Sequence, residues 1–412
     1  MTVAERIDLV RRICSFERRR CGTDAERRAA NELAAILRAG GRRAEVEPTY
    51  VHPQLGLIGA LHCAIAAAGS LLATASPAAG FAIVLVAATS LYLDVGGRAY
   101  LVRRLLFRRA SQNVLSRGPA PEAPARVVIC AHCDAGRGGA AYRSRLLHRV
   151  ARLGGTGAAR IGPFQPPFWA MAALLPLIGA RMAGVEEGWL SALQLAPTLL
   201  LIVAAFLFVD IELSPVSPGA NDNASGVATA ISLAEELGAE PAAALDVWVV
   251  LSGGEEPLQA GMRSFLRAHR DELDPAGTYF LNLDAVGRGE PRFETRAGWI
   301  VGLRMGGRLG ELCEAIAEAG DDGEAQPAPL RRPSAGDSMP PRLARLPALT
   351  LTCRAPDGSV PDLRTRADLP EALDPEALER AHALALELVR QLDRDVSRRA
   401  GAGRGAEAAA VG

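Results

Sequence analysis

The sequence lacks several features that would point to particular classes of protein. Its 46 basic residues are balanced by 46 acidic ones, so no excess of positive charge favours binding to nucleic acid. Its 7 cysteines are scattered and odd in number, which does not fit a disulfide framework. Residues 1–20 contain no long apolar core, so we expect no cleavable signal peptide. No internal repeat is found, and 412 residues are enough for one large domain or two ordinary ones.

Charged residues are missing altogether from residues 55–93. A membrane-spanning helix needs about 20 apolar residues, so we interpret this run as a hairpin of two spans that turns at Ser76-Pro77. A second apolar block covers residues 164–209, and its second half, 189–209, is long enough to span. Its first half, 168–180, is short and contains a proline, which is typical of a re-entrant or interfacial segment. The alternative is a pair of helical hairpins buried inside the protein.

Arginines flank both apolar blocks on the side of the polar sequence. Arg98 and Arg103 belong to a cluster that follows the first block, and Arg143 and Arg145 belong to one that precedes the second. Positive residues next to membrane spans remain in the cytoplasm. We therefore expect a multi-pass membrane protein whose partner is the lipid bilayer and whose polar domain faces the cytoplasm.

The polar sequence alternates between strand-like and helix-like segments. Strands are expected at 126–131, 245–251, 278–283 and 347–352, and helices at 258–269, 309–319 and 375–392. This alternation predicts an α/β domain with a mostly parallel, mixed central sheet and helices on both faces. The chain then divides into a polar domain built from 1–53, 98–163 and 212–395, two inserted transmembrane helical hairpins at 54–97 and 164–211, and a tail at 396–412 that we expect to be disordered.

A stretch of small and turn-forming residues at 218–226 surrounds one carboxylate, Asp222. A helical pattern follows directly, at 227–237. Glycine and asparagine let the chain fold tightly and bring its backbone close to a ligand. A carboxylate held just before a helix is either a helix cap or a metal ligand, and for a lone Asp the cap is the more common case. The rest of the chain favours the ligand.

Polar side chains directly follow the predicted strands. His132 and Asp134 come after the strand at 126–131, and Asp284 comes after the strand at 278–283. The pair Glu255-Glu256 follows the strand at 245–251. In sheets of this kind ligands bind beyond the carboxyl ends of the strands. We therefore expect one imidazole and several carboxylates to meet at one edge of the sheet.

Each of these features alone has an ordinary structural explanation, but together they form the donor set of a zinc site, because zinc accepts His nitrogen and carboxylate oxygen. Asp134 is well placed to accept the other N–H of His132 and so to fix its tautomer. Adjacent glutamates point in different directions. One of the pair Glu255 and Glu256 can therefore bind metal while the other deprotonates a metal-bound water.

Four motifs in this order resemble the family of co-catalytic zinc aminopeptidases, which includes bacterial leucine aminopeptidases, glutamate carboxypeptidases and glutaminyl cyclases (peptidase family twenty-eight). The resemblance covers most of the polar sequence from 125 to 392 and implies that family's three-layer α/β fold. The motifs are His132-Cys133-Asp134, the loop 219–226, Gly254-Glu255-Glu256 and the segment 282–287.

The resemblance implies a role for each matching residue. His132, Asp222 and Asp284 would hold one zinc, and Asp222 would bridge to a second zinc held by Glu256. Glu255 would be the general base, and Asp134 would orient His132. The cofactor would be one or two zinc ions, and the substrate a peptide or aminoacyl compound.

One ligand of the family pattern is missing. The family has a late His in a His-Thr-x-x-Asp segment, and the corresponding residue here is Arg364, in the segment 363–368. Arginine keeps its proton and cannot bind zinc. Either a carboxylate such as Asp337, Asp357 or Asp362 replaces the lost ligand, or the protein works with one zinc, or catalysis is lost.

Three functions follow from these outcomes. The first is a membrane-anchored zinc metallopeptidase that hydrolyses peptide or amide bonds by metal-hydroxide attack, with Glu255 as the general base. The second is a catalytically degenerate membrane scaffold or binding module with the same fold, favoured by Arg364. The third is a single-zinc acyl transferase of the glutaminyl cyclase type. The sequence leaves the oligomeric state and the preferred substrate side chain open.

Overall fold

Runs of branched and aromatic apolar residues form the strands of one mixed sheet. The structure, a computed structural model, describes residues 1–143, 162–185, 187–319, 327–332 and 334–411. The sheet has the order β1-β2-β4-β3-β5-β9-β6-β7, with β8 paired to β6. The strands are β1 Ala44–Val51, β2 Arg109–Ser116, β3 Ala125–His132, β4 Leu245–Ser252, β5 Thr278–Leu283, β6 Glu290–Ala297, β7 Leu303–Arg304, β8 Ala328–Arg331 and β9 Ala348–Arg354.

Parallel pairing brings the ends of the central strands to one edge. β3 lies between β4 and β5 and is parallel to both, and β5 is parallel to β9. In this register His132 stands opposite Ser252, and Cys130 stands opposite Asn282. The residues that follow β3, β4 and β5 therefore emerge side by side, as the sequence predicts.

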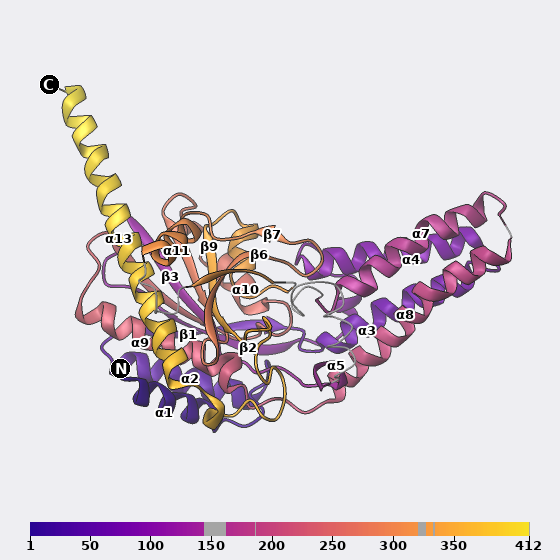
Figure 1. Cartoon of the computed structure of the whole chain (residues 1–412), viewed down its shortest axis with the longest axis horizontal. Helices are drawn as coiled ribbons and strands as arrows, with labels where there is room; N and C mark the ends of the chain where they lie inside the picture. The colour runs from indigo at the N-terminus through magenta and orange to yellow at the C-terminus, as the bar shows by residue number, and fades with distance from the viewer. Residues whose placement is uncertain (144–161, 186, 320–326, 333, 412) are drawn as a thin grey trace.

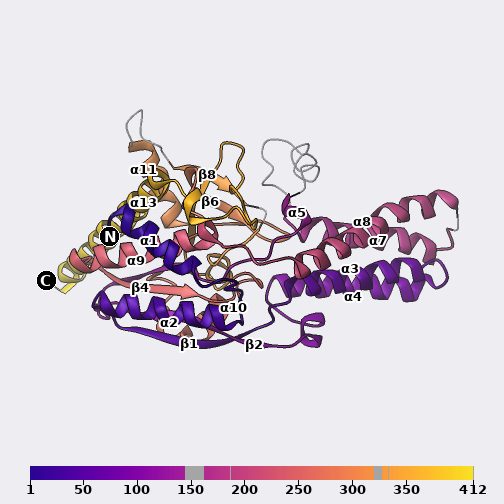
Figure 2. The same cartoon turned by 90° about the horizontal axis from the view of Figure 1, so that it is seen from below.

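Successive side chains of these strands enter two different cores. Val127, Ile129 and Ala131 belong to a core shared with α1 (Val3–Cys14), α2 (Asp24–Ala39), α9 (Ser225–Ala239), α11 (Arg308–Ala319) and α13 (Pro375–Val411). Val128 and Cys130 belong to the opposite core, shared with α10 (Ala260–Ala268). Because β-strand side chains alternate between faces, helices cover both faces of the sheet (Figure 2). The expected three-layer α/β architecture is confirmed.

Four long helices form a bundle that projects from the sheet domain (Figure 1). They are α3 (Leu55–Leu72), α4 (Pro77–Val95), α7 (Gln165–Met182) and α8 (Gly188–Leu213). α3 packs against α8, and α4 against α7. Within the described residues, α3, α4 and α8 are long and apolar enough to cross a membrane. The expected short segment at 168–180 is instead part of the 18-residue helix α7, which continues through Pro176, because packing on α4 and α8 supports the turn that lacks a backbone donor.

Polar groups inside the bundle are paired, whereas its outer surface is apolar. The ring of His62 contacts the Ile58 carbonyl oxygen at 2.7 Å and Ser90 Oγ at 2.9 Å. Gln194 donates to the backbone oxygen of Ser70 at 2.6 Å. Large side chains on α8 are exposed, among them Phe206 at 72% and Val203 at 57%. A soluble protein rarely exposes a continuous apolar surface of this length.

The C-terminal tail continues the last helix of the chain. Helix α13 extends to Val411 and includes residues 396–411, for which we expect disorder. The segment combines alanine, the residue with the highest helix propensity, with Gly401, Gly403 and Gly405, which lower that propensity. Figure 1 shows these last turns projecting beyond the sheet domain.

A close approach between α3 and α8 gives a test of the bundle. A Cβ on Gly56 would lie 2.4 Å from the backbone oxygen of Phe208, whereas one on Gly179 of α7 would meet nothing within 4 Å. Gly56→Ala should therefore lower the free energy of unfolding by about 1–3 kcal/mol through overpacking. Gly179→Ala, the matched control, should be neutral or slightly stabilising. Thermal unfolding of both variants in detergent checks this, and equal melting temperatures would contradict the packing.

Candidate metal centre

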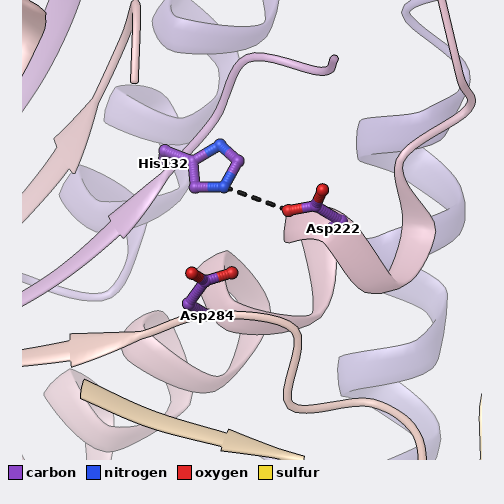
Figure 3. Close-up of side chains that lie close together, drawn as sticks. All are labelled: His132, Asp222 and Asp284. Atoms are coloured by element: carbon purple, nitrogen blue, oxygen red, sulfur yellow. Dashed lines mark ion pairs between the residues drawn. The ribbon is translucent and has the colours of Figure 1, made fainter. Parts of the chain in front are cut away.

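His132, the last residue of β3, projects from the edge of the sheet. Its Nδ1 lies 3.1 Å from the backbone oxygen of Asp134, and its Nε2 lies 3.3 Å from Oδ1 of Asp222. Figure 3 shows the imidazole between the strand end and the loop that carries Asp222. The ring is fully inside the protein, with an exposed fraction of only 3%. One ring nitrogen is thus anchored by the chain while the other faces the carboxylates.

The residues on either side of Asp222 fix its direction. Asn223 Oδ1 accepts hydrogen bonds from the backbone N–H groups of Ala285 and Gly226, at 3.0 and 3.1 Å. Asn221 Oδ1 accepts one from Gly287 N at 2.8 Å. Both asparagines therefore attach the loop to the segment after β5, and Asp222 is left to point at His132. The alternative of a helix cap is excluded, because α9 begins at Ser225 without a side-chain cap.

Asp284 completes a group of three possible ligands. One ligand atom from each of His132, Asp222 and Asp284 lies within 4.8 Å of the others, and all three residues are buried (Figure 3). Burial alone would lower the pKa of His132, but Glu255, Asp134 and Asp222 together raise it well above its usual value. These buried carboxylates therefore favour a positive charge at the imidazole, either a proton or a bound cation. An imidazole nitrogen and carboxylate oxygens at this spacing fit zinc.

Asp134 organises the glutamate pair as well as the histidine. Its carboxylate accepts hydrogen bonds from the backbone N–H groups of Glu255 and Glu256, at 3.0 and 3.2 Å. The same carboxylate lies 3.5 Å from His132 Nδ1, farther than the Asp134 carbonyl oxygen. In this geometry the backbone of Asp134 orients the imidazole, while its side chain joins the end of β3 to the Glu-Glu turn.

Glu255 is buried beside the three possible ligands. Burial, with Glu256 and Asp337 nearby, raises the pKa of Glu255 well above its usual value, although His132 opposes this. Its Oε1 accepts a hydrogen bond from Nε2 of Gln259 at 3.2 Å. Gln259 is fully buried in a left-handed conformation with φ 55°. Sequence reasoning missed Gln259; its only signal was its position one turn after the glutamate.

Arg364 points at Glu256. Its Nη2 forms an ion pair with Oε2 of Glu256, and its Nη1 donates to the Tyr142 hydroxyl at 2.6 Å. Gly136 makes room for this pair, since a Cβ there would lie 2.2 Å from Oε1 of Glu256. Burial raises the pKa of Glu256 to about 7, against the opposing effect of Arg364. A guanidinium thus pairs with Oε2 of Glu256, while Oε1 of the same carboxylate is buried without a hydrogen-bond partner among the described residues.

A second arginine, not anticipated from the sequence, contacts the other end of the group. Arg332 Nη1 forms an ion pair with Oδ2 of Asp284 and lies 3.2 Å from Oε1 of Glu294. Arg332 lies between β8 and the segment that carries Asp337, so its role depends on tertiary structure alone. Asp284 therefore has one oxygen compensated by a guanidinium.

Of the three carboxylates considered as replacement ligands, only Asp337 is near the site. It accepts a hydrogen bond from Ser252 Oγ, and burial raises its pKa to about 7. Asp362 forms an ion pair with Arg288, and Asp357 accepts a hydrogen bond from Ser359 N at 3.0 Å. None of the three replaces the missing ligand at Glu256, because Arg364 occupies that position.

Asp368 holds the loop 219–226, which carries Asp222 and which we name the metal loop. Its carboxylate accepts hydrogen bonds from the backbone N–H groups of Asn221 and Asp222, at 2.7 and 3.3 Å. Burial raises the pKa of Asp368 to about 6. The segment 363–368 therefore contributes at both of its ends: Arg364 at Glu256 and Asp368 at the loop.

Solved structures with this fold include zinc-dependent enzymes. The zinc aminopeptidase of Bacillus subtilis aligns over 95% of this chain and 95% of its own, with a TM-score of 0.53 and 13% identity. The aminopeptidase of Aneurinibacillus sp. strain AM-1 aligns over 94% and 93%, with a TM-score of 0.54 and 14% identity. The glutaminyl cyclase of Bacteroides thetaiotaomicron, bound to N-acetylhistamine, aligns over 94% and 97%, with a TM-score of 0.52 and 14% identity.

At 13–14% identity, these similarities show a common fold and nothing further. No curated protein sequence matches the chain. Residues 208–389, however, match peptidase family M28, and this segment contains Asp222, both glutamates of the pair and Asp284. The donor set of His132, Asp222 and Asp284 fits zinc, the metal named for the solved aminopeptidase of Bacillus subtilis. This carboxyl-terminal part of the chain is therefore similar to peptidase family M28.

Proposed function

We propose that the protein is a membrane-anchored zinc hydrolase of peptide or amide bonds that works with a single zinc ion. The observation that carries this proposal is the convergence of His132, Asp222 and Asp284, whose ligand atoms lie within 4.8 Å of one another. Zinc bound by these three residues would polarise a carbonyl group and make a water molecule more acidic. The substrate would be a peptide or an aminoacyl compound.

Glu255 would carry out the proton transfers, and neighbouring residues would hold it in place. Glu255 is buried next to the group and has a raised pKa, which suits a base that takes a proton from the attacking water and returns it to the leaving amine. Gln259 holds Oε1 of Glu255, so Oε2 is left for proton transfer. Asp134 fixes the backbone of the same turn through Glu255 N.

Arg364 limits the site to one metal ion. Its guanidinium pairs with Glu256, the residue expected to hold a second zinc. Burial alone would raise the pKa of Asp222, but His132 lowers it, and the charge of Arg364 adds to this effect. The guanidinium paired with Glu256 supplies the charge that a second zinc would supply, without an open coordination position.

The bundle anchors this site at the membrane. Three of its helices are long and apolar enough to span, and α8 ends at Leu213, shortly before the metal loop. Arg137 Nη1 donates to the backbone oxygen of Ser214 at 2.6 Å, which joins the loop after His132 to the end of α8. With arginines adjoining the spans, the sheet domain faces the cytoplasm.

Arg364 also favours a second function, a membrane scaffold that has kept the fold and lost catalysis. Arg364 pairs with Glu256, and Arg332 pairs with Asp284. These two guanidinium groups compensate the charge of the carboxylates without a second metal. A single-zinc acyl transferase of the cyclase type is the third possibility, and it would cyclise peptides with an N-terminal glutamine.

Metal content tests the single-zinc proposal. Purified wild-type protein should contain one zinc per chain, and Arg364→His should contain two, because imidazole offers a lone pair and frees Glu256. Arg364→Gln, the matched control, removes the charge without adding a good zinc ligand and should still contain one. Asp222→Asn should lose the metal. Elemental analysis by mass spectrometry gives these ratios, and two zinc ions in the wild type would contradict the proposal.

Activity of Glu255→Gln separates hydrolase from scaffold. The variant should retain zinc but lose activity towards aminoacyl p-nitroanilides by about 100- to 10,000-fold, since it loses only the proton transfer. Glu318→Gln, an exposed position on α11, is the matched control and should be fully active. If the wild type holds zinc yet releases nothing from a panel of such substrates, and Glu255→Gln keeps the cellular role, the protein is a scaffold.

A further inference from the structure

Residues 98–109, most of the connection between α4 and β2 together with the first residue of β2, carry an unusual combination of exposed side chains. Outside the four bundle helices, the described part of the chain exposes seven large apolar side chains. Three of them, Leu101, Leu105 and Phe107, lie in this connection, and a fourth, Tyr50, lies on β1 beside it. Leu105 has the highest exposed fraction of all, 79%. We name residues 98–109 the juxtabundle segment.

Arginines alternate with these apolar residues. Arg98, Arg104, Arg108 and Arg109 are exposed. The guanidinium of Arg108 lies 5.2 Å from the centre of the Tyr50 ring, and that of Arg109 lies 5.3 Å from the centre of the Phe107 ring. Each of these two charges is thus presented together with an aromatic surface. Contact of these rings and leucines with water is unfavourable, so an apolar partner would stabilise this surface.

The segment is fixed in place at the start of the bundle. Arg103 and Asp94 form a buried ion pair, with Arg103 Nη2 2.6 Å from Asp94 Oδ1, and Arg103 Nη1 also lies 3.4 Å from the Pro257 carbonyl oxygen. Val102 is buried next to it. The exposed side chains are therefore held outward by a rigid support, and Figure 2 shows the connection below the start of the bundle, beside the domain.

We propose that the juxtabundle segment binds the headgroups of anionic phospholipids and inserts Leu105 and Phe107 into the membrane interface. Guanidinium groups pair bidentately with phosphate, and aromatic rings and leucines favour the boundary between headgroups and acyl chains. The segment follows α4 directly, so it meets the same bilayer that the bundle enters. The inference rests on the membrane anchoring in the proposed function and adds a lipid preference to it.

A fluorescent probe at Leu105 tests the inference. Leu105→Cys, in a Cys14→Ser background because the other native cysteines are buried, is labelled with an environment-sensitive dye. Full-length protein is then reconstituted into vesicles of phosphatidylcholine, with or without phosphatidylglycerol. The emission should shift to the blue in the anionic vesicles, and added Arg104→Gln and Arg108→Gln should abolish the difference. The same dye on Leu369, an exposed leucine next to the helical turn that packs on α1, is the control and should report water in both vesicles.

Extraction with alkaline carbonate separates this inference from the anchoring itself. Protein that resists extraction while the dye at position 105 stays in water in both vesicles overturns the inference and leaves the anchoring intact. A shift that is equal in both vesicles and independent of the arginines also overturns it. Protein that is extracted contradicts the membrane spans, and a dye response to phosphatidylglycerol in that protein would support lipid binding by the segment alone.

Discussion

The dominant constraint on this structure is the burial of many carboxylates at one edge of the sheet. The parallel strands β3, β4 and β5 bring Asp134, Glu255 and Asp284 together, and the loop before α9 adds Asp222. Two like charges about 4 Å apart repel by about 4 kcal/mol in a medium of effective dielectric 20. The site is therefore stable only with protons or cations in it, and its cations decide what it can do. Arg332 pairs with Asp284 and Arg364 with Glu256, so the proposed zinc position is the group of His132, Asp222 and Asp284.

Sequence reasoning located this edge because its signals are local. Each central strand is a short apolar run, and the first polar residues after the run mark where the strand leaves the core. His132, Glu255 and Asp284 could be placed in this way before any contact was known. The apolar helices were found for the same reason, since membrane length and lack of charge are properties of a continuous stretch. The turn residues around Asp222 marked a close approach, although they left open whether the carboxylate was a cap or a ligand.

Residues that act across the fold had no such signal. Arg332 and Gln259 look like ordinary surface or helix residues, and only the tertiary structure brings them to Asp284 and Glu255. Asn221 and Asn223 are typical turn formers, yet their side chains join the metal loop to the segment after β5. The sequence shows that Arg364 stands in place of an expected ligand, but its pairing with Glu256 is set by the tertiary structure. What the sequence could not supply was the partner of each polar group, because partners are set by packing.

The bundle and the proposed base are connected through one residue pair. Leu258 and Gln259 follow the Glu-Glu turn, and both have positive φ, at 69° and 55°. Leu258 packs into the core of the bundle, whereas Gln259 donates to Glu255 and lies 3.4 Å from the indole nitrogen of Trp299. That indole stacks edge-on against Phe164, which in turn stacks on Phe208 of α8. Non-glycine residues keep such a conformation only when the surroundings hold it on both sides. The position of Glu255 therefore depends on contacts with the bundle helices, so the bundle supports the site.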